Sequence, residues 1–89
     1  MVIHEIFGLT DWARAVADHL AAEGFIAVAP DLLSGKAPGG GGSRTITADQ
    51  ARGLVTALQP AEVTRRLNAA AAYATNNTDL DAAVVLCGT

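Results

Sequence analysis

The sequence predicts an α/β protein with about three parallel strands and three helices. Two runs of apolar residues, 25–29 and 82–86, have no polar face, which is typical of strands covered on both sides in a parallel sheet. Elsewhere, apolar residues recur at spacings of three and four, as expected for helices that bury one face. The length of 89 residues allows one small domain, covering residues 1–89.

The first half of the chain reads as a strand, a helix and a second strand. A strand that begins almost at the first residue is predicted by the short apolar run of Val2, Ile3, Ile6 and Phe7, which Gly8 bounds. Thr10 is suited to cap the helix that follows, and Gly24 is suited to end it. The run 25–29 then completes a βαβ unit. The apolar stripe of the helix consists of Ala13, Val16, Ala17 and Leu20.

Segment 34–45 interrupts this pattern. It contains the glycine run 39–42 and has no periodicity, so we expect an exposed, flexible, Gly-rich loop. No Gly-Lys-Ser/Thr sequence follows the run, which argues against a phosphate loop. Thr47 followed three positions later by Gln50 predicts a capping box that opens a second, short helix. Its apolar face consists of Ala51, Leu54, Val55 and Leu58.

Pro60 is suited to the first position of a third helix, which the pair Asn76-Asn77 should end. Glu62 is spaced to pair with Arg65 or Arg66 on one side of this helix. The run 82–86 follows and predicts the third strand. The apolar face of the helix consists of Val63, Leu67, Ala70, Ala71 and Ala74.

Composition narrows the function. The net charge of −3 and the pI of about 5.0 argue against a nucleic-acid partner, which would favour a basic surface. With 51% hydrophobic and 17% charged residues, the chain is not of the disordered class. No window has the roughly 20 apolar residues that a membrane span needs, and residues 1–5 lack the features of a signal peptide. We therefore expect a cytoplasmic protein, while an export signal ahead of Met1 would also fit the sequence.

The predicted core is thin. The chain has 19 alanines and only four aromatic residues, so each buried side chain removes little area from water. Apolar strands at both ends of the chain would leave sheet edges and faces uncovered. These features predict that the chain is a piece of a larger domain. One cysteine, Cys87, excludes an intramolecular disulfide.

His4 and Glu5 are the most specific candidates for chemistry, because they end the first predicted strand, and ligands of open α/β sheets bind beyond the carboxyl ends of strands. A bare His-Glu pair can equally form an ordinary solvated turn. A zinc protease motif is excluded, because Gly8 stands where the second histidine is needed. The other histidine, His19, lies on the polar side of the first helix, where we expect it to be solvated.

Three stretches carry a family resemblance: HEIFGLTDW at 4–12, AVAD at 15–18 and LAAEGFIAVAPDLLSGK at 20–36. They resemble the dienelactone hydrolase family of α/β-hydrolases. The similarity is dense over residues 2–38 and weaker over 60–73. It implies a partial α/β-hydrolase-like three-layer fold, with this chain as the amino-terminal half of the enzyme.

The resemblance implies hydrolysis of a lactone or activated carboxylic ester by a Cys, His and Asp triad, with no metal and no organic cofactor. Glu5 would be the motif glutamate that contacts the nucleophilic cysteine, and a carboxylate there can take or return the thiol proton. The backbone N–H of Ile6 would be one donor of the oxyanion hole. The implied partner of the intact enzyme is a small-molecule lactone or ester, with no nucleic acid and no membrane.

The nucleophile region departs from the family pattern. The family has Gly-x-Cys-x-Gly-Gly at a sharp strand-to-helix turn, whereas Val85 stands here at the first glycine position and Gly88 comes one position early. Cys87 is therefore either the nucleophile in an altered context or a small buried hydrophobic residue. The Asp and His of the triad follow the nucleophile in the family, so we expect this chain alone to be inactive.

Other polar residues leave alternatives open. Asp31 ends the second predicted strand and either lines a pocket or is a turn carboxylate. Arg44 and Arg52 lie in the region where the family places an arginine that binds the substrate carboxylate, and the sequence selects neither.

Three hypotheses result. The first is part of a dienelactone hydrolase-like enzyme. The second is a non-catalytic βαβ module that associates with itself or with a partner protein through exposed sheet edges. The third, a small metal hydrolase that uses His4 and Glu5, lacks further ligands.

Overall fold

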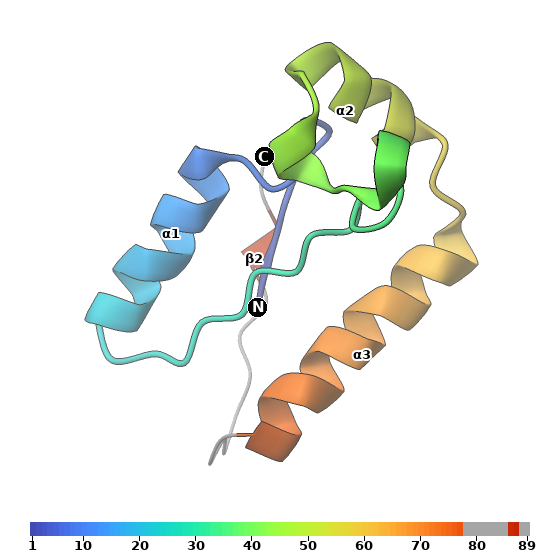
Figure 1. Cartoon of the computed structure of the whole chain (residues 1–89). Coiled ribbons are helices and arrows are strands. Elements are labelled where there is room, and N and C mark those ends of the chain that lie inside the picture. The colour runs from blue at the N-terminus through green and yellow to red at the C-terminus, as the bar shows by residue number, and fades with distance from the viewer. Residues whose placement is uncertain (78–85, 88–89) are drawn as a thin grey trace.

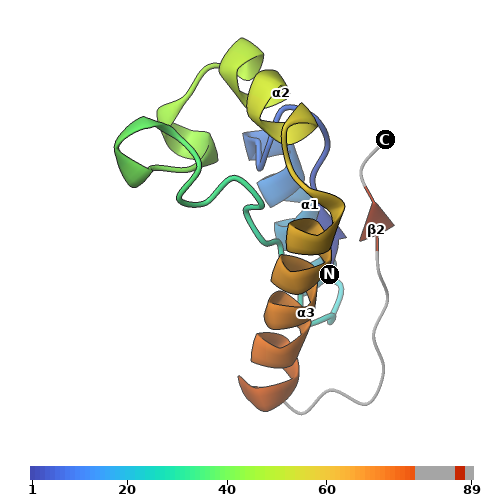
Figure 2. The same cartoon turned by 90° about the vertical axis from the view of Figure 1, so that its right-hand side faces the viewer.

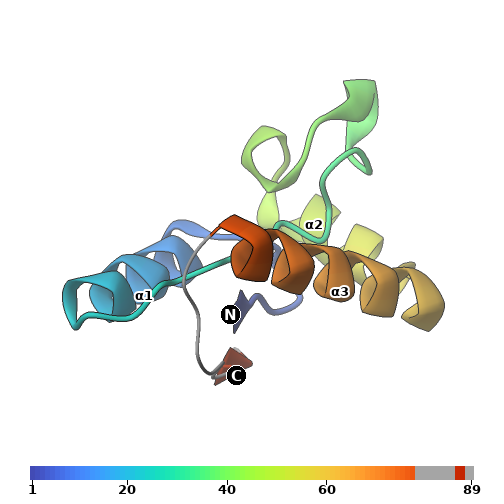
Figure 3. The same cartoon turned by 90° about the horizontal axis from the view of Figure 1, so that it is seen from below.

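The computed structural model describes residues 1–77 and 86–87, and Figure 1 shows its helices arranged around a short pair of strands. The elements in chain order are β1 (Val2–Ile3), α1 (Asp11–Ala22), η1 (Pro38–Gly40), η2 (Ser43–Thr45), α2 (Ala48–Thr56), α3 (Pro60–Asn77) and β2 (Leu86–Cys87). Helix α1 packs against β1. In Figures 2 and 3, β1 lies between β2 and the two longer helices, α1 and α3.

The strands β1 and β2 are parallel, with Val2 opposite Leu86 and Ile3 opposite Cys87. Strand β2 thus begins at the last residue of the predicted third strand, while residues 82–85 lie outside the described part of the chain. The first strand is shorter than predicted, because it ends at Ile3 and the chain turns at residues 5–8.

The prediction of a strand over 25–29 was wrong. These residues form no regular ladder, and one backbone bond, from the Val2 N–H to the Val28 carbonyl at 2.7 Å, joins them to β1. Phe25 and Ile26 remain 56% and 46% exposed. An apolar run becomes a strand only where neighbouring backbone supplies repeated hydrogen bonds. Within the described residues the sheet therefore has two parallel strands, and not the three that were predicted.

The three predicted helices are confirmed, and local signals set their ends. The Thr10 hydroxyl accepts a hydrogen bond from the Ala13 N–H at the start of α1. At α2 both bonds of the predicted capping box are present, because Thr47 and Gln50 each bond the other's backbone N–H. Helix α3 begins at Pro60, whose missing N–H is not needed in a first turn.

The core among the described residues is thin, as composition predicts. It consists of Val2, Leu9, Ala13, Leu32, Leu33, Ala37, Ala51 and Ala74, of which Leu33 is the one fully buried large side chain. Each helix contributes one alanine to this set. Large apolar side chains such as Trp12 and Tyr73 stay 66% and 68% exposed. No helix in the described ranges is both long and apolar enough to cross a membrane.

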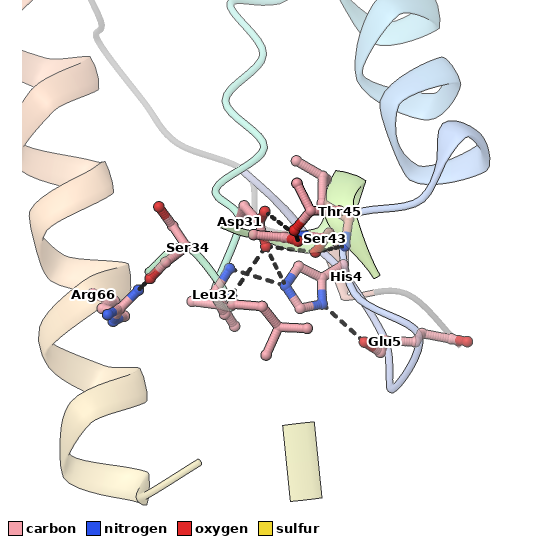
Figure 4. Close-up of polar contacts among 11 residues, drawn as sticks. His4, Glu5, Asp31, Leu32, Ser34, Ser43, Thr45 and Arg66 are labelled. Carbon is pink, nitrogen blue, oxygen red and sulfur yellow. Dashed lines mark hydrogen bonds and ion pairs between the residues drawn. The ribbon is translucent and has the colours of Figure 1, made fainter. Parts of the chain in front are cut away.

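Segment 34–45 follows a path set by its own hydrogen bonds. It contains η1 and η2, and the Gly41 carbonyl accepts bonds from the N–H groups of Gly35 and Ala37 at 2.9 and 3.2 Å. Its start is tied to α3, because Arg66 donates to the Ser34 carbonyl at 2.8 Å (Figure 4).

A charged cluster reinforces this tie. Glu62 pairs with both predicted partners, Arg65 at 3.5 Å and Arg66 at 3.2 Å. It also pairs with Lys36 of the loop at 2.9 Å, a contact that helical spacing does not predict. The hydrogen bond from Lys36, together with the charges of Lys36 and Arg66, holds the pKa of the Glu62 carboxyl below its ordinary value.

Candidate active site at the end of strand β1

The chain leaves β1 through a tight turn over residues 5–8. The Gly8 N–H donates to the Glu5 carbonyl at 3.1 Å, and the Thr10 N–H donates to the Gly8 carbonyl at 2.9 Å. Gly8 has a φ of +79°, a conformation that favours glycine. A Cβ at this position would lie 2.5 Å from the Ser43 Oγ, so the turn also needs the smallest residue for space. We call residues Glu5–Gly8 the Glu5 turn.

Glu5 presents an unsatisfied carboxylate oxygen. Its Oε1 is buried and has no hydrogen-bond partner within the described part of the chain. Glu5 lines a small cavity of about 60 Å³ between β1 and the start of α1. A buried carboxylate oxygen without a protein partner is energetically unfavourable unless a water, an ion or a ligand bonds it, so this atom calls for an explanation.

The next residue, Ile6, exposes 40% of its surface within the same turn. Of the groups in residues 1–77 and 86–87, none accepts a hydrogen bond from its backbone N–H. The Glu5 turn therefore combines a carboxylate oxygen and an amide donor on adjacent residues, both without a protein partner in these ranges.

His4 is buried, which corrects the interpretation of His4 and Glu5 as an ordinary solvated turn. Its side chain is 1% exposed. The Nδ1 atom donates to the Glu5 carbonyl at 2.8 Å, and Nε2 accepts the Leu32 N–H at 3.0 Å (Figure 4). Because a carbonyl only accepts and an N–H only donates, these bonds assign the neutral Nδ1–H tautomer. His4 is thus a structural link between β1 and the segment that contains Leu32.

Asp31 is a turn carboxylate, which was one of the two roles that the sequence left open for it. Its Oδ1 accepts the Leu33 N–H at 3.0 Å, as in an Asx turn. Ser43 donates both its hydroxyl, at 2.6 Å, and its backbone N–H, at 2.8 Å, to the same carboxylate. Partial burial raises the pKa of the Asp31 carboxyl, but the bonds from Ser43 and Leu33 outweigh it and hold the pKa below its ordinary value.

Ser43 is the residue that sequence analysis missed. Besides contacting Asp31, its Oγ accepts the Leu9 N–H at 2.9 Å, immediately after the Glu5 turn. Figure 4 shows Ser43 next to Asp31. A serine beside a glycine run has no local signature of such a contact, because its partners lie 12 and 34 positions away.

The remaining candidates divide. The register of β1 and β2 places the backbone of Cys87 beside Ile3, at the carboxyl ends of the two parallel strands. Ile3 precedes Glu5 by two residues, so the backbone of Cys87 lies near the start of the Glu5 turn. Arg44 and Arg52 are exposed, and in the described ranges neither forms an ion pair with Glu5. His19 is solvated as predicted, with a side chain 77% exposed. Residues 1–77 and 86–87 contain no group of three or more side chains suited to hold a metal ion.

Comparison with known proteins gives two matches. The model of the dienelactone hydrolase family matches residues 1–89. A curated protein of Synechocystis sp., named "Putative carboxymethylenebutenolidase", is 37% identical over 75 residues. The matched region covers 83% of this chain but 30% of that protein, so the chain spans about a third of the relative's length. No solved structure is significantly similar to the chain.

Proposed function

The chain belongs to the dienelactone hydrolase family, and on that premise we propose that it carries one part of the active site of an enzyme that hydrolyses lactones or carboxylic esters. The family has the α/β-hydrolase fold, and in this proposal the remaining strands and the rest of the triad lie in sequence beyond these 89 residues. The observation that carries the proposal is the Glu5 turn, which has a buried carboxylate oxygen and a backbone donor without protein partners in the described residues.

The register of the sheet supports a role for Cys87 as the nucleophile. Parallel pairing of Ile3 with Cys87 brings the backbone of Cys87 to the edge of the sheet from which the Glu5 turn leaves. The carboxyl edge of parallel strands is where ligands of open α/β folds bind. In this proposal the Glu5 carboxylate takes the thiol proton of the cysteine, which creates the reactive thiolate.

The reaction then follows the chemistry of acyl transfer. The thiolate attacks the carbonyl carbon of the lactone or ester, and the Ile6 N–H stabilises the negative charge on the carbonyl oxygen. Collapse of the tetrahedral intermediate breaks the C–O bond and leaves an acyl thioester on the cysteine. The departing oxygen, which leaves with the alcohol of an ester and stays attached to the acyl chain of a lactone, takes up the proton that Glu5 received from the thiol. Water then hydrolyses the thioester, with the triad histidine as base, and restores the thiol.

The decisive test begins with the encoding DNA. The longest reading frame that contains these 89 residues is expressed, and hydrolysis of a dienelactone and of p-nitrophenyl acetate is measured beside the 89-residue chain alone. The whole protein should be active and the short chain nearly inactive. In the whole protein, Glu5→Gln should lower kcat/KM by about 10²–10⁴, and Cys87→Ala should abolish turnover.

A matched control separates the proposed role of Glu5 from a general loss of charge. Glu23→Gln changes a carboxylate that is 62% exposed at the end of α1, and it should leave kcat/KM unchanged. Glu5→Gln should keep the melting temperature, because Oε1 has no hydrogen bond to lose. A whole protein without hydrolase activity, or equal activity in Glu5→Gln and the natural protein, would refute the proposal.

The exposed apolar surface favours a second candidate, a module that associates with itself or a protein partner. Six large hydrophobic residues are at least 40% exposed among the described residues: Ile6, Phe7, Trp12, Phe25, Ile26 and Tyr73. Such surface favours association. Analytical ultracentrifugation of the 89-residue chain tests this reading, since self-association predicts a mass that rises with concentration. Either candidate fits the proposed cytoplasmic location.

A further inference from the structure

Both ends of the Glu5 turn are held by one short segment, Asp31–Leu33. At the near end, His4 accepts the Leu32 N–H at 3.0 Å. At the far end, the Leu9 N–H bonds the Ser43 Oγ at 2.9 Å, and this hydroxyl donates to Asp31 at 2.6 Å (Figure 4). Of the four residues between these anchors, Glu5 accepts the His4 Nδ1–H through its carbonyl at 2.8 Å, and none of their side chains forms a hydrogen bond within the described ranges.

The far anchor depends on one hydroxyl group. A serine hydroxyl has a single proton, and Ser43 donates it in the hydrogen bond to Asp31, because a carboxylate can only accept. The hydroxyl oxygen is then free to accept the Leu9 N–H. Leu9 therefore donates to Ser43, and Ser43 donates to Asp31. The Ser43 N–H bonds the second carboxylate oxygen at 2.8 Å, which fixes the serine itself.

The packing around Ser43 leaves it little freedom. A Cβ on Gly8 would lie 2.5 Å from its Oγ and 3.2 Å from Leu33 Cδ1, so the turn is in close contact with both residues. Leu33 is fully buried. The Ser43 hydroxyl and the buried Leu33 side chain thus both lie against the turn at Gly8.

We infer that Ser43 is a positioning residue, whose hydroxyl transmits the position of Asp31 to Leu9 and so sets the direction in which the Glu5 turn presents the Ile6 N–H. This inference rests on the proposed function, because the turn matters for catalysis only if Ile6 is an oxyanion donor. Ser43 itself touches neither the proposed nucleophile nor the substrate. A preorganised donor is worth more in catalysis than a mobile one.

The test uses the full 89-residue chain and measures backbone amides by NMR. Ser43→Ala removes the hydroxyl, Ser43→Thr keeps it, and Thr45→Ala is the matched control, since the Thr45 hydroxyl of the same loop donates to the Gly42 carbonyl. Hydrogen exchange at Leu9 is compared with exchange at Arg14, whose N–H bonds Thr10 within α1. Ser43→Ala should raise the Leu9 to Arg14 ratio about tenfold or more.

The same variant should move the Ile6 amide resonance. Ser43→Thr should keep the ratio of the Leu9 to the Arg14 exchange rate within about threefold of the natural chain, because threonine retains the hydroxyl that accepts the Leu9 N–H. Thr45→Ala should change neither readout. An unchanged Leu9 ratio in Ser43→Ala, or equal effects of Ser43→Ala and Ser43→Thr, would overturn the inference.

A pH titration of the unaltered chain tests the inference without any variant. The titratable group that faces the Asp31 carboxylate among the described residues is His4, with its Nε2 3.9 Å away. The Leu9 amide shift should follow the titration of the Asp31 carboxyl carbon. A Leu9 amide shift that does not change as Asp31 titrates would refute the role of Ser43 in linking Asp31 to Leu9. These readouts need no substrate, so failure of the hydrolase assay and failure of the positioning role are distinguished.

Discussion

His4 and Leu32 are 28 positions apart in the sequence, and a hydrogen bond of 3.0 Å from the Leu32 N–H to His4 Nε2 joins them inside the fold. This bond attaches the residue that follows β1 to the turn that begins at Asp31. The histidine of the most specific sequence motif therefore has a structural partner, whereas the glutamate beside it has a buried carboxylate oxygen without a partner among the described residues.

Replacement of this histidine should destabilise the chain. His4→Ala leaves the Leu32 N–H without its acceptor and opens a cavity where a side chain 1% exposed had packed. We expect a loss of about 2–4 kcal/mol in the free energy of unfolding, measured by urea denaturation. The control His19→Ala, at a side chain 77% exposed, should change it by less than about 0.5 kcal/mol. Equal effects at the two histidines would contradict the buried link.

Asp31 should make stability depend on acid pH. Its three hydrogen bonds favour the carboxylate, so its pKa is lower in the folded chain than in the unfolded chain. The stabilisation is fully present above the unfolded pKa, near pH 4, and is lost as the pH falls through the folded pKa below it. Asp31→Asn should lower the free energy of unfolding at pH 7 by about 1–3 kcal/mol.

The comparison of the two chains isolates this contribution. The difference between the natural chain and Asp31→Asn should shrink as the pH is lowered from 6 to 2.5, as measured by urea denaturation at each pH. Glu62 also has a lowered pKa, because Lys36 and Arg66 bond its carboxylate, and its contribution cancels in the difference. A difference that stays constant over this range would show that the Asp31 carboxylate is not stabilised by these bonds.

Gly8→Ala should be more damaging than the same change at a glycine with similar backbone geometry. Gly8 and Gly39 have φ values of +79° and +73°, so both substitutions carry the strain of a left-handed residue, about 1 kcal/mol. Only at Gly8 does the added Cβ collide with the Ser43 Oγ, whereas nothing lies within 4 Å at Gly39. We expect about 2–4 kcal/mol of destabilisation at Gly8 from thermal unfolding, and similar melting temperatures for the two variants would be the opposing result.

Arg66 should protect the Gly-rich loop from proteolysis. Its guanidinium donates to the Ser34 carbonyl at 2.8 Å and to Glu62 at 3.2 Å, which ties the start of the loop to α3. Arg66→Ala should therefore increase the rate of trypsin cleavage after Lys36, because cleavage requires local opening of the chain. Arg65→Ala removes a side chain that is 70% exposed and has no bond to the loop, and it should leave the rate unchanged. Mass spectrometry of timed digests measures both rates.

The helices illustrate what local sequence can predict. The pair Thr47 and Gln50 predicts the start of α2, and Pro60 predicts the start of α3, because capping and a fixed φ act within one turn of the residue that supplies them. The apolar stripes predicted for the three helices include Ala13, Ala51 and Ala74, the one buried residue of each helix among the described side chains. These features need no knowledge of distant residues.

The strands and the site depended on distant partners. The apolar run 25–29 resembles a covered strand, yet a strand exists only where neighbours bond it, and one bond to Val2 is present. The sequence singled out Glu5 and Ile6 by resemblance and placed them at the end of the first predicted strand, whereas the structure places both in the turn that follows β1. It assigned no role to Ser43, whose hydroxyl lies between residues 12 and 34 positions away.

By itself, the sequence determined the helices, the family and the position of the His4-Glu5 pair, because each rests on residues within a few positions of one another. The tertiary structure alone decided that His4 is buried and that Asp31 and Ser43 support the Glu5 turn. The physical reason is that a polar side chain is satisfied by whichever donor or acceptor the folded chain brings within about 3 Å. That partner is chosen by the packing of segments, which no local pattern encodes.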